Sequence, residues 1–386
     1  MSFSFRDIEI ETPTRTGSPA ASSGAAPRSD IYYWKSDRPG AFQRAASERP
    51  QLPGLPKLLL GELQRTFPGT EITLEPAHGQ GNHITFFAIT PEWRGFVRVE
   101  DGPERDDFMD VESSIIETVR GIGIPAPKVY AVDSSRKRVP FAWQVLQLIS
   151  DPDLNQVEKS GKLDILKVAK EIGRYVASWQ SIRTCGFGPF NPEIFRSSRQ
   201  LAGHHSDYPS YFLLRLRRHL AFLLDHGFLD SEKAEEIIAT ITHHRHHLEL
   251  TEGCLVHKDL ALWNILGTPQ HISAFIDWED AISGDPLDDL SLVGCFHPGE
   301  VVTQALQGYQ ELRTLPDNHR ARFWLHLLRN MLVKAVVRLG SGFFERSDEL
   351  FLINAGATGK DLSSFTRERI HAALSGLTGN KEVADL

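Results

Sequence analysis

Cysteine is scarce in this 386-residue chain, and none of its three cysteines has the spacing of a metal site or a disulfide framework. Cys185, Cys254 and Cys295 lie far apart and include no Cys-x-x-Cys pair, which is typical of a reducing compartment. The chain also lacks an apolar run long enough to cross a bilayer, and its first residues lack the basic-then-apolar pattern of a signal peptide. We therefore expect a cytoplasmic protein with no membrane partner.

Basic residues are not in excess either. The chain has 42 Lys and Arg against 50 Asp and Glu, for a net charge of -8. A dedicated nucleic-acid binder would usually carry a basic face, so we expect no nucleic-acid partner. The acidic balance is compatible with a cationic small substrate but does not require one. The length is sufficient for two lobes, each with its own core.

The first 54 residues differ in composition from the rest. Residues 1–30 are rich in Ser, Thr, Ala, Pro and Gly, and their small apolar surface cannot offset the entropy of ordering, which predicts a flexible tail. Residues 31–54 form an aromatic arm, because an unstructured tail would rarely carry so many aromatic side chains. We expect this arm either to pack on the body or to form part of a binding surface. Its aromatic residues are Tyr32, Tyr33, Trp34 and Phe42.

A small lobe is predicted over residues 55–150. Residues 55–67 have the pattern of a helix, and a second helix is expected over residues 106–120, where apolar residues fall on one stripe. These elements predict a five-stranded, mainly antiparallel sheet with one important helix. The strand-like segments are residues 72–75, 83–90, 95–99, 128–133 and 141–149.

A larger, mainly helical lobe is predicted over residues 151–386. Apolar residues keep helix spacing from residue 163 until the segment CGFGPFNP, residues 185–192, breaks the helix. Further helices are expected over residues 211–227, 231–250 and 323–336. The fold class is therefore α+β, with a sheet lobe followed by a helical lobe.

The chemistry is concentrated in residues 255–291. An apolar pair leads into His257 and Asp259, and Asn264 follows five residues after that Asp. A second apolar run ends on Asp277. One Asp could orient a hydroxyl, while an Asn and a second Asp could hold magnesium on a nucleotide, as phosphoryl transfer requires. The alternative for each residue is a capping role in a loop or turn.

Three ordered segments resemble the aminoglycoside phosphotransferase and choline kinase-like family. HKDLALWN, residues 257–264, is similar to the family's H-x-D-x-x-x-x-N catalytic loop. AFIDWEDAISGDPLDDLS, residues 274–291, is similar to its I-D-W/F-E-x-x-x-x-G-D-P-x-x-D-L segment. Upstream, Glu112 lies thirteen residues before Pro125, as in the family's passage from helix to strand. The resemblance extends over roughly residues 74–340.

This resemblance implies the two-lobed protein-kinase-like fold. Residues 55–150 would be the nucleotide-binding N-lobe, and residues 151–386 would be the C-lobe with the catalytic loop and the acceptor site. Within the family, CGFGPFNP and RGFVRVE (residues 94–100) resemble segments of hygromycin B phosphotransferases.

The resemblance also implies roles for single residues. Asp259 would be the catalytic base that orients the acceptor hydroxyl, and His257 would hold the backbone of the loop. Asn264 and Asp277 would bind Mg2+. Glu279 could contact a second metal ion or the acceptor, or could be a solvated acid.

On the nucleotide side, Arg98 would contact phosphates and pair with Glu112, where protein kinases use a lysine. The alternative is a surface ion pair of little consequence. Gly79, Gly81 and Asn82 would form a loop over the phosphates, because glycines let backbone N–H groups approach an anion. The adenine edge would meet backbone groups around residues 144–148.

Six acidic residues between positions 277 and 289 predict a negative region. Magnesium would neutralise part of it, and the remainder could attract an amine-bearing acceptor. Asp285 is expected to satisfy backbone N–H groups of its turn. Asp289 could cap the helix that follows.

The expected function is therefore a magnesium-dependent kinase that uses ATP or GTP to phosphorylate a hydroxyl of a small molecule. The acceptor could be aminoglycoside-like, a sugar, a cyclitol or an amino alcohol. A nucleotide-binding pseudokinase or scaffold without turnover is the alternative. A protein kinase is disfavoured, because Trp-Glu follows Asp277 where protein kinases have Phe-Gly, and no Ala-Pro-Glu segment follows.

Overall fold

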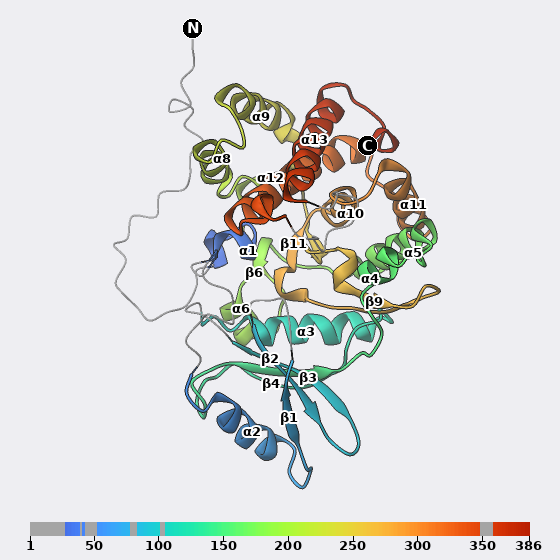
Figure 1. Ribbon diagram of the computed structural model, residues 1–386. Coiled ribbons are helices and arrows are strands. Elements are labelled where there is room, and N and C mark those ends of the chain that lie inside the picture. The colour runs from blue at the N-terminus through green and yellow to red at the C-terminus, as the bar shows by residue number, and fades with distance from the viewer. Residues whose placement is uncertain (1–27, 39–40, 43–51, 78–82, 101–104, 348–357) are drawn as a thin grey trace, which may run out of the picture.

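The computed structural model describes residues 28–38, 41–42, 52–77, 83–100, 105–347 and 358–386. Figure 1 shows two lobes, one built on an antiparallel sheet and the other mainly of helices. The predicted α+β, kinase-like architecture is thereby confirmed. None of the described helices is both long and apolar enough to cross a membrane.

The sheet of the N-lobe has the strand order β1-β2-β3-β5-β4, and every neighbouring pair is antiparallel. Helix α2 (Leu55–Thr66) precedes the sheet, and α3 (Phe108–Gly121) lies between β3 and β4 in the chain. These elements lie within a few residues of the predicted ones. The strands are β1 (Thr73–Pro76), β2 (His83–Ile89), β3 (Arg94–Glu100), β4 (Val129–Asp133) and β5 (Trp143–Gln147).

The two faces of this sheet have different partners. Val97 and Val99 of β3 pack in one apolar cluster with Leu59 and Leu63 of α2. Side chains alternate along a strand, so Arg98 points to the opposite face. Figure 1 shows α3 on that side, between the sheet and the helical lobe. The alternation therefore places one charged residue at the boundary between the lobes.

The C-lobe is built around the long helix α12 (His319–Gly340), which contacts α10 and α13. Helices α5 and α11 approach closely, since a Cβ on Gly173 would collide with the backbone of Ala305. The other helices of this lobe are α4 (Leu154–Lys159), α5 (Ile165–Trp179), α6 (Pro192–Ser198), α7 (Tyr208–Phe212), α8 (Leu216–Asp225), α9 (Ser231–His244), α10 (Leu287–Gly294), α11 (Gly299–Gln310) and α13 (Gly359–Thr378).

One prediction for the C-lobe was wrong. The helix expected over residues 211–227 is two helices, because Arg215 takes a left-handed backbone (φ 62°) between α7 and α8. The segment at residues 185–192 follows the end of α5, as expected, and it also contains the strand β6. A four-stranded sheet of order β7-β6-β11-β8 was missed, because strands of three or four residues are too short to show alternation. Its strands are β6 (Phe187–Phe190), β7 (Gly203–His205), β8 (Cys254–Val256) and β11 (Ile282–Gly284).

Residues 28–38, which we call the N-terminal arm, precede the N-lobe in the chain but pack on the C-lobe. A 3-10 turn (Arg28–Asp30) contacts β6 and β7, and α1 (Trp34–Asp37) contacts α12. Ile31, Tyr32, Tyr33 and Trp34 are all buried. Residues 31–38 of the predicted aromatic arm therefore pack on the body, which was the first of the two alternatives. Residues 39–40 and 43–51 of that arm, and residues 1–27 of the predicted tail, lie outside the described residues.

Candidate active site

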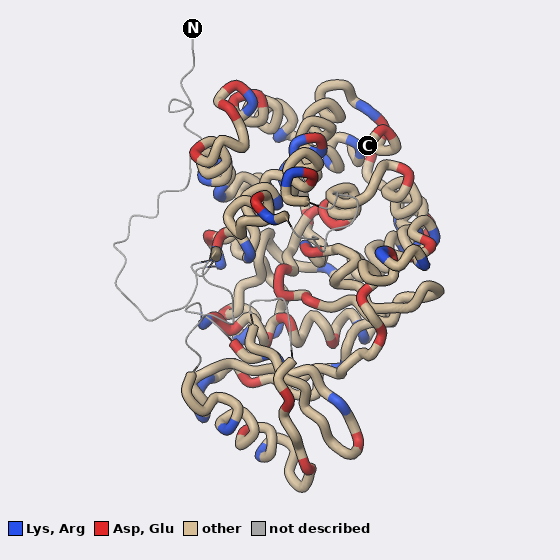
Figure 2. The backbone as a smooth tube through the Cα atoms, viewed as in Figure 1, with Lys and Arg blue, Asp and Glu red and all other residues tan. Residues whose placement is uncertain are grey.

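The candidate site lies where the C-lobe faces α3, and Figure 2 shows acidic positions gathered there. Strand β8 leads into the loop of residues 257–264, and the hairpin of β9 (Ile265–Gly267) and β10 (Ile272–Phe275) then leads to Asp277. Lys258 and Asp277 both have left-handed backbones, with φ of 69° and 64°. Such backbone is costly for residues other than glycine and is often found at functional sites.

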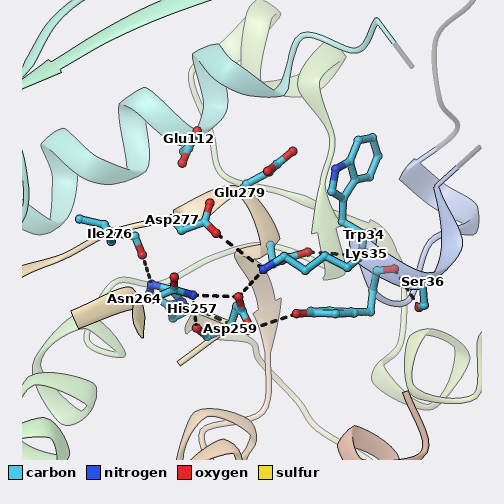
Figure 3. A network of polar contacts seen from close by, with 12 residues as sticks. Trp34, Lys35, Ser36, Glu112, His257, Asp259, Asn264, Ile276, Asp277 and Glu279 are labelled. Carbon is cyan, nitrogen blue, oxygen red and sulfur yellow. Dashed lines mark hydrogen bonds and ion pairs between the residues drawn. The ribbon is translucent and has the colours of Figure 1, made fainter. Parts of the chain in front are cut away.

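Asp259 is buried and accepts several hydrogen bonds (Figure 3). Asn264 Nδ2 donates to Asp259 Oδ2 at 2.8 Å, and Lys35 Nζ donates to the same oxygen at 2.5 Å. Tyr33 Oη donates to Asp259 Oδ1 at 2.9 Å. Burial alone would raise the pKa of Asp259, but the charge of Lys35 and these hydrogen bonds hold it below its usual range. The carboxylate is therefore ionised and poised to accept a hydrogen bond.

The backbone of the loop is held by two buried side chains. His257 Nε2 donates to the carbonyl of Ile276 at 3.0 Å, and burial lowers the pKa of His257, which keeps the ring neutral. The carboxylate of Asp289 accepts the backbone N–H groups of His257 and Lys258, each at 3.0 Å. The suggestion that Asp289 caps a helix was therefore wrong. It lies inside α10 and holds the loop of Asp259.

Two further acids of the negative region are structural. Asp285 Oδ1 accepts the backbone N–H of Leu287 at 2.8 Å, as expected, and both its oxygens pair with Arg322 at 2.7 and 2.8 Å. Asp288 Oδ2 accepts from Lys258 Nζ at 2.6 Å. These acids are compensated by cations of the same lobe.

Arg98 and Glu112 form a buried ion pair of 2.5 Å between β3 and α3. The other terminal nitrogen of Arg98 lies 3.4 Å from both Asp277 Oδ1 and Glu279 Oε2. Burial raises the pKa of Glu112, and Arg98 opposes that rise. Arg98 therefore connects Glu112 of the N-lobe with two carboxylates of the C-lobe. Its positive charge lies beside Asp277, the predicted magnesium ligand.

Glu279 is buried and surrounded by basic groups of other segments. His83 Nε2 donates to it at 3.3 Å, and Arg28 lies 4.0 Å away. Burial would raise the pKa of Glu279, but His83 and Arg98 hold it below its usual range. The chain's own cations thus neutralise much of the negative region, so the expected excess of charge is smaller than the sequence suggested.

Two predicted parts of the nucleotide site need separate comment. One lies outside the described residues, and in the other some backbone groups are already used in hydrogen bonds. Gly79, Gly81 and Asn82, the predicted phosphate loop, fall in the segment 78–82, outside the described residues. In the predicted adenine region, the backbone N–H groups of Gln147 and Leu148 donate to the carbonyls of Lys128 and Arg94.

Two residues that contact Asp259 could not be predicted from any local sequence signal. Tyr33 and Lys35 lie more than 220 positions earlier in the chain and outside every motif. The only hint was the dense group of aromatic residues in the arm.

A sheet lobe with a buried Arg–Glu pair, followed by a loop with Asp and Asn and then a second Asp, is the arrangement expected of a kinase-like phosphotransferase. The profile of the phosphotransferase enzyme family (APH) matches residues 73–324, which is more than half of the chain. The protein belongs to this family and is a phosphotransferase. A comparison with curated protein sequences found no match.

Solved structures share the fold at low sequence identity. A thermostable mutant of aminoglycoside phosphotransferase APH(4)-Ia, in a ternary complex with ADP and hygromycin B, is 17% identical with a TM-score of 0.56, over 81% of this chain and 97% of that one. The macrolide 2'-phosphotransferase MphH from Brachybacterium faecium is 17% identical with a TM-score of 0.52, over 84% and 99%. At this level of sequence identity, these similarities show a shared fold and not a shared substrate.

Proposed function

We propose that the protein is a small-molecule kinase that moves the γ-phosphoryl group of ATP or GTP to a hydroxyl group. The observation that carries this proposal is the arrangement of Asp259, Asn264 and Asp277 beside the Arg98–Glu112 pair. A base, two oxygen ligands and a fixed positive charge are the parts that phosphoryl transfer needs.

In this proposal each residue of the site has a defined task. Asp259 accepts the hydrogen bond of the acceptor hydroxyl and later its proton. As the bond from the acceptor oxygen to the γ-phosphorus forms, the bond to the leaving nucleoside diphosphate breaks. Arg98 stabilises the charge on the phosphates, and Glu112 keeps its guanidinium in place. Catalysis is then positioning and charge stabilisation, without a covalent enzyme intermediate.

The donor set of the site fits magnesium bound to a nucleotide. Among the residues that the structure describes, no three His, Cys, Asp or Glu side chains form a metal-binding group. Mg2+ in kinases usually takes only one or two protein carboxylates, and phosphates and water complete its shell. Asp277 would supply a carboxylate, and Asn264 its amide oxygen, because the amide nitrogen is used on Asp259. The ion would supply positive charge to the phosphate oxygens.

The identity of the donor and the acceptor is proposed at the level of chemical class. Structures of APH(4)-Ia contain ADP or AMP-PNP together with hygromycin B. The solved relatives of the same fold include a macrolide 2'-phosphotransferase. An aminoglycoside-like compound, a sugar, a cyclitol and an amino alcohol are therefore the acceptor classes to test.

An acceptor screen tests the function directly. The wild-type protein would be incubated with Mg2+, with ATP or GTP, and with members of these four classes, including hygromycin B. Release of ADP or GDP and the mass of the phosphorylated product would be measured. We expect nucleotide consumption that depends on one class of acceptor. Binding of nucleotide without turnover on any acceptor would favour the scaffold and contradict the proposal.

A further inference from the structure

The N-terminal arm brings a lysine between the two principal carboxylates of the site (Figure 3). Lys35 Nζ lies 2.5 Å from Asp259 Oδ2, 3.7 Å from Asp277 Oδ2 and 3.8 Å from Asp280 Oδ2. In phosphoryl transfer the acceptor hydroxyl is at the base, and the nucleotide phosphates are at the magnesium ligand. A cation between Asp259 and Asp277 is therefore on the path of the transferred group.

The catalytic loop itself does not supply such a cation. Residues 260–263 are Leu-Ala-Leu-Trp, and the only Lys or Arg in the loop is Lys258. The ammonium group of Lys258 is buried, bonded to Asp288 at 2.6 Å and to Asn330 at 3.1 Å. It is committed to the interior of the C-lobe. The arm thus supplies a charge that the loop lacks.

The ammonium group of Lys35 can serve a phosphoryl group without leaving Asp259. It has three N–H donors, and among the described residues only the contact with Asp259 is within hydrogen-bond distance. The distances of 3.7 and 3.8 Å to the other two carboxylates are those of loose ion pairs. The side chains of Lys35 and Asp277 are 29% and 30% exposed, whereas that of Asp259 is 3% exposed. Lys35 therefore faces the open part of the site.

The base also keeps room for an acceptor. An ionised carboxylate offers about four lone-pair sites. Among the described residues, Lys35 and Asn264 take two sites on Oδ2 of Asp259, and Tyr33 takes one on Oδ1. One site on Oδ1 is left for a hydroxyl group.

The arm is anchored as a permanent part of the C-lobe. The ring of Tyr32 stacks on Tyr211 at 5.0 Å between centroids, and the guanidinium of Arg329 lies 3.7 Å from its centroid. Asp37 accepts the backbone N–H of Tyr32 at 3.1 Å and pairs with His219 at 2.6 Å. An inhibitory plug would have to leave for each turnover, and these buried contacts oppose its departure.

We propose that Lys35, which lies outside the matched family segment, is a catalytic residue whose ammonium group contacts the transferred phosphoryl group between Asp259 and Asp277. This inference rests on the proposed kinase function. As the bond from phosphorus to the leaving diphosphate breaks and the bond to the acceptor oxygen forms, the hydroxyl proton passes to Asp259. Lys35 keeps its own protons and stabilises the phosphoryl oxygens throughout.

The test uses the full chain and compares Lys35→Met with wild type. Lys57→Met, a change of an exposed lysine on α2, is the matched control. The probes are ADP alone and ADP with aluminium fluoride, both with Mg2+. Aluminium fluoride imitates the phosphoryl group in the transition state of the transfer. We expect Lys35→Met to bind ADP as wild type does but to bind the aluminium fluoride complex about 10²- to 10³-fold more weakly. The turnover number, on water or on an acceptor found in the screen, should fall by a similar factor.

A second variant separates the charge from the fold of the arm. Turnover by Lys35→Ala should be partly restored by ethylammonium chloride, whereas that of Asp259→Asn should not. Equal affinity of Lys35→Met and wild type for the aluminium fluoride complex would overturn the inference, as would a rise in turnover, which would identify the arm as an inhibitor. If wild type neither binds ADP nor consumes nucleotide, the proposed function fails and this inference fails with it.

Discussion

The side-chain amide of Asn264 donates two hydrogen bonds to Asp259, one to its backbone oxygen and one to Oδ2, each at 2.8 Å. Both bonds use the amide nitrogen, so the amide oxygen of Asn264 is turned away from Asp259. One residue thereby fixes the position of the proposed base and the direction of a predicted magnesium ligand. The five-residue spacing in the motif has its physical reason in this contact.

Replacement of Asp259 by Asn tests the base. The amide keeps the size of the side chain but cannot accept the proton, so we expect the turnover number to fall by about 10²- to 10⁴-fold. Affinity for nucleotide, measured by calorimetry, should change little because Asp259 faces the acceptor side. Turnover near the wild-type level would remove the proposed role of Asp259.

The Arg98–Glu112 pair should also matter for stability. In Arg98→Met the carboxylate of Glu112 stays buried without its partner, which should lower the free energy of unfolding by about 3 kcal/mol in urea titrations. Adding Glu112→Leu in the same chain should recover much of this loss, because the buried charge of Glu112 is then removed and Glu279 keeps its contacts with His83 and Arg28. Arg174→Met, which breaks the exposed Arg174–Glu311 pair, is the control and should leave stability nearly unchanged. Equal losses at the two sites would contradict the buried-pair argument.

Two lysines near the catalytic loop should respond differently to the same substitution. Lys258→Met leaves Asp288 buried without its cation, so the midpoint of thermal unfolding should fall, with a loss of about 3 kcal/mol. Lys35→Met should lower that midpoint less, because the ammonium group of Lys35 is partly exposed and Asp259 keeps its hydrogen bonds from Asn264 and Tyr33. Differential scanning calorimetry of both variants checks this contrast. A large loss of stability in Lys35→Met alone would show that Lys35, and not Lys258, has the mainly structural role.

The pH dependence of stability should include a contribution from Glu158. Burial raises the pKa of Glu158 to about 7, and the neighbouring His297 has its pKa lowered to about 4 by burial, so it offers no charge at neutral pH. Between pH 4.5 and 7 the folded state holds a proton on Glu158 that the unfolded state has released, so stability falls as pH rises through this window.

We therefore expect Glu158→Gln to become more stable than wild type as pH rises from 5 to 8, by about 1 to 3 kcal/mol at the upper end. Urea titrations at several pH values measure the difference. Glu252→Gln changes an exposed carboxylate and serves as the control. An unchanged difference between Glu158→Gln and wild type across this range would show that Glu158 titrates alike in both states.

The N-lobe could be predicted from the sequence because its determinants are local. Its strands are short, mainly apolar segments separated by turn residues, and α3 has one apolar stripe. The contact of Asn264 with Asp259 and the pair of Arg98 with Glu112 could be predicted from motif spacing. The break between α7 and α8 could not be predicted. It depends on the left-handed backbone of Arg215, and no Gly or Pro at that position indicates such a conformation.

The contribution of the arm to the site was also beyond local reasoning. Tyr33 and Lys35 reach Asp259 only because Tyr32 and Asp37 are fixed in the C-lobe by residues far along the chain. No spacing rule connects an arm near position 35 to a loop near position 259. The aromatic residues indicated that the arm is ordered, but its partner is set by tertiary packing.

The placement of the N-terminal arm has a mechanical consequence for the N-lobe. The arm is fixed to the C-lobe before the N-lobe begins, and the chain returns to the C-lobe after β5. The N-lobe is thus tethered at both of its ends rather than hanging from one hinge. Any opening between the lobes would therefore take place between two attachment points on the C-lobe, and it would have to break the contacts of Arg98 with Asp277 and Glu279.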